Sequence, residues 1–201
     1  MSIDVKKTAL LLLDLQNEMV DPKGKVGGGG LAAVVQERKI LENARSALQA
    51  ARKAEVTVVF VRVGFRADYA DVLSVAPRVA KLKENKAVIL GSWGTEFPEQ
   101  LAPRDDEMIF TKQCVNPFFN TGLMTWLMQR GKSHLVIGGV VTNLVVESTA
   151  RAGDDAGFAL AVLEDCCAAP NPEWHRFAIE NTLPLFASIS SSAEFVSNLA
   201  G

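Results

Sequence analysis

The sequence predicts an α/β fold in which helices cover both faces of a parallel β-sheet. Several short apolar runs lack the alternation of a half-exposed strand, so each is expected to be a strand buried on both faces. Amphipathic stretches with helical periodicity separate these runs. Strands that alternate with helices in this way form parallel sheets with helices on both sides.

Six segments have the composition of buried strands. The first ends in two polar residues, Asp14 and Gln16, and the third ends in Lys112. The fourth runs into two small residues, Gly138 and Gly139, directly before a turn. In chain order the expected strands are 8–16, 55–63, 107–112, 134–140, 158–166 and 185–190.

Helices are expected between these strands. A turn-rich loop at 17–30 precedes the first of them, which shows a clear apolar side. Gly131 closes the second, and Asn171 with Pro172 opens the fourth. Thr142 and Ser192 are the expected caps of the third and the last. The expected helices are 32–54, 118–131, the one that starts at Thr142, 171–183 and 192–200, while 64–106 reads as short helices and loops that roof a pocket.

Length and composition limit the class of protein. The 201 residues suit a single domain, 1–201, with a substantial core. A hydrophobic content of 48% and a charged content of 22% are typical of a soluble globular domain. The formal net charge of −2 offers no basic surface for nucleic acid, and the apolar runs are too short to span a membrane.

Cysteine usage and the first residues suggest a compartment. The three cysteines, Cys114, Cys166 and Cys167, do not make a disulfide framework. No long apolar segment of the secretory type precedes the first expected strand. A cytoplasmic protein is therefore expected.

Three features follow strand ends: Asp14, Lys112 and the turn at 141–145. The carboxyl ends of parallel strands meet at one edge of the sheet, so these features are expected to share one pocket. A carboxylate and an ammonium group would stabilise each other there, and burial would shift the pKa of either. The alternatives are a purely structural ion pair or two unrelated surface charges.

Four segments resemble the isochorismatase-like cysteine hydrolase family, in the same order and along nearly the whole chain. They are LLLDLQNEM with Asp14, FTKQCVNPFFNTGL with Lys112, GGVVTNLVVESTARAG, and VLEDCCAAPNPEWH with Asp165. VNPFFNT and VVESTAR look closest to the ureidoacrylate amidohydrolase branch. The resemblance implies a Rossmann-like six-stranded parallel sheet with helices on both faces.

The resemblance also implies a site. Amidohydrolases of this family hydrolyse nicotinamide, N-carbamoyl compounds, ureidoacrylate and related small amides with an Asp–Lys–Cys triad. Asp14 and Lys112 match the first two members. A non-proline cis peptide bond is expected at Val140–Val141, with the N–H groups of Val141 and Val145 directed at the substrate oxygen.

The chain departs from the family pattern at the nucleophile. The family's T-x-x-C-V reads TNLVV at 142–146, so the catalytic cysteine position holds Val145. Valine has no lone pair and cannot form an acyl-enzyme. Isochorismatases proper also lack this cysteine and hydrolyse a vinyl ether with the aspartate as proton donor, but their turn carries Ala-His-like residues where this chain has Thr142 and Asn143.

Two readings of the function remain open. In the first, the protein is a hydrolase of a small molecule in which Asp14 acts with Lys112 without covalent catalysis, on a vinyl ether or a C–N bond. In the second, it is a catalytically inactive family member that binds a small ligand or a protein partner. The retained Asp14 and Lys112 favour the first, although a buried pair can also be structural.

Further cysteine, histidine and aromatic residues lie outside the matched triad positions. Cys114 is expected to be a small apolar filler rather than a replacement nucleophile, and His134 and His175 are expected to be structural. The aromatic residues Trp93, Phe118 and Phe119 are expected to line the substrate pocket, or else to be core or subunit-interface residues.

Two further segments bear on metal binding and on the oligomeric state. Zinc-binding nicotinamidases carry an Asp-x-His signature after the second strand, whereas VRVGFRADY has no histidine, so no metal and no cofactor are expected. The predicted helix 118–131 has more apolar residues than one core face needs, which predicts a homodimer or larger homo-oligomer.

Overall fold

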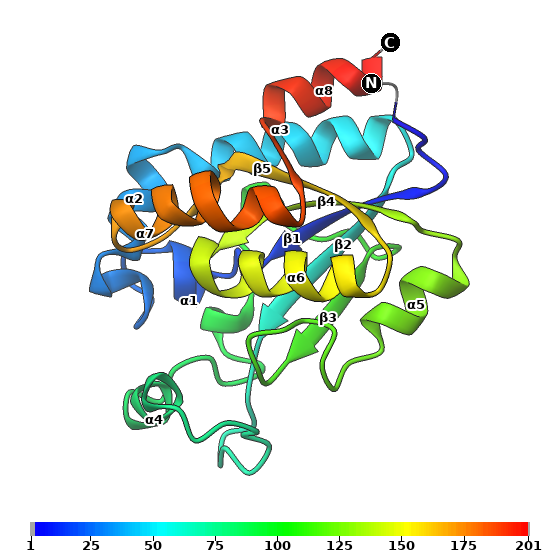
Figure 1. Cartoon of the computed structure of the whole chain (residues 1–201). Coiled ribbons are helices and arrows are strands. Elements are labelled where there is room, and N and C mark those ends of the chain that lie inside the picture. The colour runs from blue at the N-terminus through cyan, green and yellow to red at the C-terminus, as the bar shows by residue number, and fades with distance from the viewer. Residues whose placement is uncertain (1–2, 201) are drawn as a thin grey trace.

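The computed structural model describes residues 3–200. Its centre is a six-stranded, fully parallel sheet in the order β3-β2-β1-β4-β5-β6, with helices on both faces (Figure 1). The strands are β1 (Thr8–Leu13), β2 (Thr57–Val63), β3 (Met108–Lys112), β4 (His134–Val140), β5 (Ala159–Ala168) and β6 (Ser188–Ser190). The predicted Rossmann-like fold class is confirmed.

The strand order reverses between β1 and β4, and a binding crevice is expected beside this reversal. The chain moves outward from β1 through β2 to β3, then returns to β4 on the other side of β1. Leu13 at the end of β1 pairs with Val61 and with Gly139, and Val63 pairs with Lys112. The carboxyl ends of four neighbouring strands therefore lie together beside the reversal point, where open α/β sheets form a binding crevice.

Two separate apolar cores flank the sheet. Leu10 and Leu12 of β1 point to one core, and Leu11 and Leu13 point to the other, because successive side chains of a strand face opposite ways. This explains the unbroken apolar run that predicted β1. The first core is covered by α2 (Leu31–Glu37), α3 (Ile40–Lys53) and α8 (Ser192–Ala200), and the second by α5 (Leu123–Gln129) and α6 (Glu147–Asp155) (Figure 1).

The predicted helix 32–54 is two helices. α2 ends at Glu37 with Arg38 as its C-cap, and Lys39 adopts a left-handed backbone conformation with φ of 54° before α3 begins. The Arg38 side chain donates to the Cys167 carbonyl and pairs with the Glu164 carboxylate. The interruption therefore coincides with a long-range contact to β5 that the local periodicity does not encode.

The predicted helix 118–131 is also shorter than expected. Residues 116–122 form a loop in which Asn116 Oδ1 accepts from the Phe118 N–H at 2.9 Å, and only α5 is regular helix. Proline disfavours helix in the residue before it, and asparagine stabilises turns, so the Asn116–Pro117 pair accounts for the late start. Gly131, with φ of 64°, follows the end of the helix as predicted.

This shorter helix removes the basis of the oligomer prediction. Leu123 and Leu127 are completely buried and Phe118 is nearly so. Among the other aromatic residues of this segment, Phe119 is exposed, and Trp126 is half-buried under the guanidinium of Arg130. The prediction that this helix has more apolar residues than one core face needs is therefore wrong. Oligomerisation stays a prediction without this support.

The remaining elements follow the prediction with local differences. Segment 64–106 does contain a short helix, α4 (Pro77–Glu84), which lies apart from the helical layers on the sheet faces (Figure 1). Two short elements lie in the expected loop at 17–30: α1 (Asn17–Val20) and a 3₁₀ turn at Gly27–Gly29. β6 starts at Ser188 rather than at 185, because a 3₁₀ turn covers Leu183–Leu185.

Two of the predicted caps can be compared directly near the end of the chain. α7 (Pro172–Phe177) is capped as predicted, since Asn171 Oδ1 accepts from the Glu173 N–H at 2.8 Å. Ser192 is not the cap of α8. Ser191 Oγ accepts from the Glu194 N–H, and the Glu194 carboxylate accepts from the Ser191 N–H, which is a capping box.

Between residues 3 and 200, every helix is too short or too polar to cross a membrane.

Candidate active site

Asp14 follows β1 directly, in a strained backbone conformation. Its φ of 55° lies in the left-handed region, which non-glycine residues seldom adopt and aspartate tolerates better than most. The Asp14 N–H donates to the Val61 carbonyl at 2.9 Å, so the turn is tied to β2. Such strain persists where surrounding structure fixes the residue, which is frequent at functional sites.

The polar residues after Asp14 hold the surrounding loops. The fully buried Gln16 side chain donates to the carbonyls of Val63 (3.0 Å) and Gly94 (3.1 Å) and accepts from the Val63 N–H at 2.8 Å. The buried Glu18 carboxylate accepts from the Val88 N–H at 3.0 Å. These side chains therefore join the chain after β1 to the end of β2 and to the segments around Val88 and Gly94.

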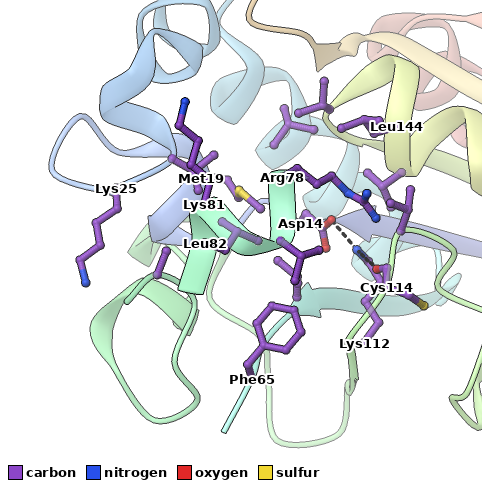
Figure 2. A pocket seen from close by; sticks show the side chains of 18 of the residues that line it. Asp14, Met19, Lys25, Phe65, Arg78, Lys81, Leu82, Lys112, Cys114 and Leu144 are labelled. Carbon is purple, nitrogen blue, oxygen red and sulfur yellow. Dashed lines mark hydrogen bonds and ion pairs between the residues drawn. The ribbon is translucent and has the colours of Figure 1, made fainter. Parts of the chain in front are cut away.

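Lys112 forms a buried ion pair with Asp14. Its Nζ lies 2.8 Å from Asp14 Oδ2 and also donates to the Cys114 carbonyl at 3.0 Å (Figure 2). Asp14 is 4% exposed and Lys112 is 2% exposed, so neither is a surface charge. The prediction that the two strand-end residues meet is confirmed.

The second oxygen of Asp14 has no protein partner. Oδ1 is buried and accepts no hydrogen bond from any of residues 3–200. Burial raises the pKa of Asp14, and the opposing charge and hydrogen bond of Lys112 do not cancel this effect. A carboxyl group of this kind holds a proton more tightly than an exposed aspartate.

The turn after β4 has the predicted peptide geometry. The bond between Val140 and Val141 is cis, as expected. Gly139 has a φ of 152°, and a Cβ at this position would lie 2.0 Å from the Leu13 carbonyl oxygen. The turn continues as a wide π-helical turn, Thr142–Val146, which runs into α6.

Thr142 does not cap this helix. Its buried hydroxyl lies 2.8 Å from His175 Nδ1, because α7 packs against the turn. His175 Nε2 lies 2.9 Å from Glu164 Oε1, and Glu164 pairs with Arg38. Hydrogen bonds from His175 and then Arg38 lower the pKa of Glu164 to about 2. His175 is thus a buried structural histidine, as expected, and it anchors the turn to α7 and β5.

The strand ends and the turn border a cavity of about 470 Å³. Asp14 and Lys112 line one side, and Arg78, Lys81 and Leu82 of α4 line another (Figure 2). Val141 and Val145 of the turn also line it. Val145 is 2% exposed and contributes to the apolar wall. The volume and the mainly apolar lining with a few convergent polar groups are those of a small-molecule site.

The three aromatic residues expected to line the pocket lie elsewhere. Trp93 is 44% exposed in a 3₁₀ turn, Phe118 stacks on Phe158 in the core with ring centroids 6.3 Å apart, and Phe119 is 61% exposed. Phe65 is the aromatic side chain of the cavity instead. The sequence marked these residues only as aromatic, which does not distinguish a pocket from a core or surface position.

The cysteines do not supply a reactive thiol to Asp14. Cys114 lines the cavity, but its Sγ donates to the Asn116 carbonyl at 3.1 Å, and burial raises its pKa. Cys166 and Cys167 are fully buried, and burial raises the pKa of Cys167 to about 12. In residues 3–200, no three or more His, Cys, Asp or Glu side chains are grouped to hold a metal ion.

Comparison with known proteins identifies the family. The isochorismatase domain model matches residues 8–194. The ureidoacrylate amidohydrolase RutB of Acinetobacter baylyi is 29% identical over 204 aligned positions, covering 95% of this chain and 83% of that protein.

Solved structures agree with this match. A cysteine hydrolase from Pseudomonas syringae pv. phaseolicola 1448A is 26% identical with a TM-score of 0.85, covering 100% of this chain and 95% of that one. An isochorismatase family protein from Desulfovibrio vulgaris has the same fold, with a TM-score of 0.83 at 21% identity, covering 97% of this chain and 99% of that one. The chain therefore belongs to the isochorismatase family.

Proposed function

We propose that the protein hydrolyses a small molecule with Asp14 as proton donor and Lys112 as its charge partner, without a cysteine nucleophile. One observation carries this proposal: Asp14 lines the cavity with Oδ2 held by Lys112, while its buried Oδ1 has no hydrogen-bond partner among residues 3–200. The raised pKa supports a donor role, because the protonated form persists above the usual range of aspartate.

A vinyl ether is the substrate class that best suits a proton donor. Asp14 transfers its proton to the terminal vinyl carbon, and the ether oxygen lone pair forms an oxocarbenium ion. Water adds to the cationic carbon, and its lost proton returns to Asp14. The resulting hemiketal expels the alcohol and leaves a ketone, so one water is consumed and the carboxyl group is regenerated. Lys112 stabilises the transient Asp14 carboxylate, since Nζ lies 2.8 Å from Oδ2.

A C–N bond is the other candidate. The relatives matched in sequence are named ureidoacrylate amidohydrolases. In this chain, water would have to attack the carbonyl carbon while Asp14 protonates the leaving nitrogen, because Val145 cannot form an acyl-enzyme. The C–N bond then breaks, and the proton lost by the water returns to Asp14. The N–H groups of Val141 and Val145 would then donate to the developing oxyanion.

A second function has its own support. Val145 occupies the position at which the family's amidohydrolases carry their thiol, and it closes the apolar wall of the cavity. A family member that only binds a small ligand or a protein partner would need no group able to attack a substrate there. Such a protein would keep the buried ion pair for structural reasons.

A substrate screen separates these functions. Purified protein is incubated with isochorismate, ureidoacrylate, N-carbamoyl compounds and nicotinamide, and products are measured by mass spectrometry. The proposal expects turnover of the vinyl ether isochorismate, or of a C–N substrate without a covalent intermediate. Binding of several compounds without turnover of any would favour the ligand-binding alternative and contradict the proposed catalysis.

The proposed proton donor predicts a specific pH dependence. Because burial raises the pKa of Asp14 above its ordinary value of 3.8, the protonated donor persists above that pH. We expect kcat/KM to fall as pH rises through the raised pKa of Asp14, measured from about pH 4 to about pH 9. A value of kcat/KM that instead rises across this range would show that ionised Asp14 acts as a base.

Val145→Cys tests whether the side chain at this position faces Asp14 and Lys112. The new thiol would line the cavity beside the Lys112 ammonium, which favours the thiolate. We expect modification by iodoacetamide at residue 145, located by peptide mapping so that modification of Cys114 is counted separately. Weak amidase activity could accompany it.

Val146→Cys is the matched control, because Val146 is completely buried in the second core and does not line the cavity. Its thiol should stay unmodified in the folded protein. If iodoacetamide modifies neither new thiol, position 145 does not face the site.

A further inference from the structure

The cavity combines apolar walls with an unusual set of charges. Within the described chain, 3–200, four cationic side chains line it, Lys25, Arg78, Lys81 and Lys112, and Asp14 is the only carboxyl group of the lining. The chain as a whole carries a net charge of −2, so this concentration of positive charge does not reflect the composition. Lys112 is already paired with Asp14, which leaves the other three to be explained.

Two of these cations, Arg78 and Lys81, have no partner among residues 3–200. Lys25 donates to the Lys86 carbonyl at 2.6 Å, whereas the side chains of Arg78 and Lys81 make no hydrogen bond or ion pair with any of these residues. Of the two, Arg78 extends its guanidinium from α4 toward the Asp14–Lys112 pair (Figure 2). Burial raises the pKa of the Cys114 thiol, and the charge of Lys112 and, to a smaller extent, that of Arg78 oppose this effect.

The placement of Arg78 follows from the helix geometry. Arg78, Lys81, Leu82 and Asn85 all line the cavity, and residues three, four and seven apart lie on one side of a helix. Lys83 belongs to the same helix but does not line the cavity.

Two features hold α4 against the rest of the protein. Val79 is buried, and the Tyr69 hydroxyl donates to the Ala87 carbonyl at 2.7 Å just after the helix. The side of α4 that bears Arg78 is therefore held toward the strand ends.

We propose that the substrate carries a carboxylate group, which Arg78 binds through its guanidinium with Lys81 nearby, while the scissile bond lies at Asp14. This inference rests on the proposed function for the position of the scissile bond. The planar guanidinium matches a carboxylate with two parallel hydrogen bonds, and an apolar surrounding strengthens that pairing. The apolar lining between the two charged ends, including Val141 and Val145, accommodates the uncharged middle of such a molecule.

The ordinary alternative is that Arg78 and Lys81 are solvated cations of an exposed helix. Both residues are exposed, and lysine and arginine commonly occupy such positions. The alternative predicts that Arg78 and Lys83 have the same influence on ligand binding, whereas the proposal predicts an influence of Arg78 and none of Lys83.

Paired ligands test the proposal. Binding of N-carbamoylglycine is compared with that of its primary amide, and benzoate with benzamide, by calorimetric or NMR titration. The titrations use Asp14→Asn protein, so that no turnover is needed. Each acid is expected to bind about tenfold or more tightly than its amide, since a hydrogen bond to a charged group contributes a factor of about ten or more.

Variants of α4 locate the effect. Arg78→Gln should weaken binding of the acids about tenfold or more and leave the amides unchanged, and Arg78→Lys should recover part of the loss. Lys83→Gln is the matched control and should leave all four affinities unchanged. Because both positions are exposed, the fold should persist, which circular dichroism checks.

Three results would overturn the carboxylate site: equal binding of acids and amides, an equal loss in Lys83→Gln and Arg78→Gln, or no binding of any of the four compounds up to their solubility. These results are distinct from failure of the proposed catalysis. Acid selectivity that depends on Arg78, in a protein that hydrolyses nothing, would keep the site and refute the catalysis. Hydrolysis of acids and amides at equal efficiency would keep the proposed catalysis and refute the carboxylate site.

Discussion

Asp14→Asn is expected to lower kcat by roughly 10²–10⁴-fold on whichever substrate the protein hydrolyses, the usual contribution of a general acid. Asparagine has nearly the same shape, and its carbonyl oxygen can still accept from Lys112, which lies 2.8 Å from the native carboxyl group. The amide cannot donate a transferable proton or take one up. The loss should therefore appear in kcat, with little change in substrate affinity.

Asp154→Asn is the matched control, because Asp154 is exposed near the end of α6, outside the cavity lining. It should leave kcat unchanged, and the measurement is a steady-state comparison of the three proteins at one pH. Undiminished turnover by a folded Asp14→Asn protein would remove Asp14 from the mechanism and leave the buried pair as a structural feature.

Gly139→Ala is expected to lower the free energy of unfolding by at least about 3 kcal/mol, through backbone strain and overpacking. The backbone φ of 152° suits glycine, and a Cβ would lie 2.0 Å from the Leu13 carbonyl oxygen. Relief of this clash requires the end of β1 to move away from β4, which also displaces Asp14. Urea unfolding measures the stability change.

Gly122→Ala is the control for this effect. A Cβ at Gly122 would meet only Phe110 Cε1, at an ordinary contact distance of 3.8 Å, and its φ of −81° is accessible to alanine. This variant should stay within about 1 kcal/mol of the native protein, the usual size of a glycine-to-alanine change at a compatible site. Equal stability of the two variants would contradict the close approach of β1 and β4.

Much of the fold was predictable because burial on both faces leaves a direct mark on the sequence. β1 supplies leucines to two cores, which required the unbroken apolar run that identified it. Asp14 and Lys112 could be placed together because each ends a strand and parallel strands end at the same edge. The cis bond at Val140–Val141 was expected from the family resemblance alone, since nothing in local residue preferences indicates it.

Element boundaries were predicted less well where distant contacts decide them. The interruption at Lys39 coincides with the reach of Arg38 to β5, and Thr142 contacts His175 of α7 instead of capping its own helix. A one-dimensional pattern reports local propensity and the side of a segment that is buried. It does not report which residue, more than 30 positions away, will accept a hydrogen bond.

By itself, then, the sequence determined the α/β class, the six strands, and the catalytic candidates at their carboxyl ends. The tertiary structure decided what surrounds them. Within α4 only Val79 is buried, so the helix carries no apolar stripe, and its position depends on contacts such as the one between Tyr69 and Ala87. The direction of Arg78 toward Asp14 and Lys112 is therefore visible only in the folded chain. It arises from packing between distant segments, and the local sequence of neither segment predicts that packing.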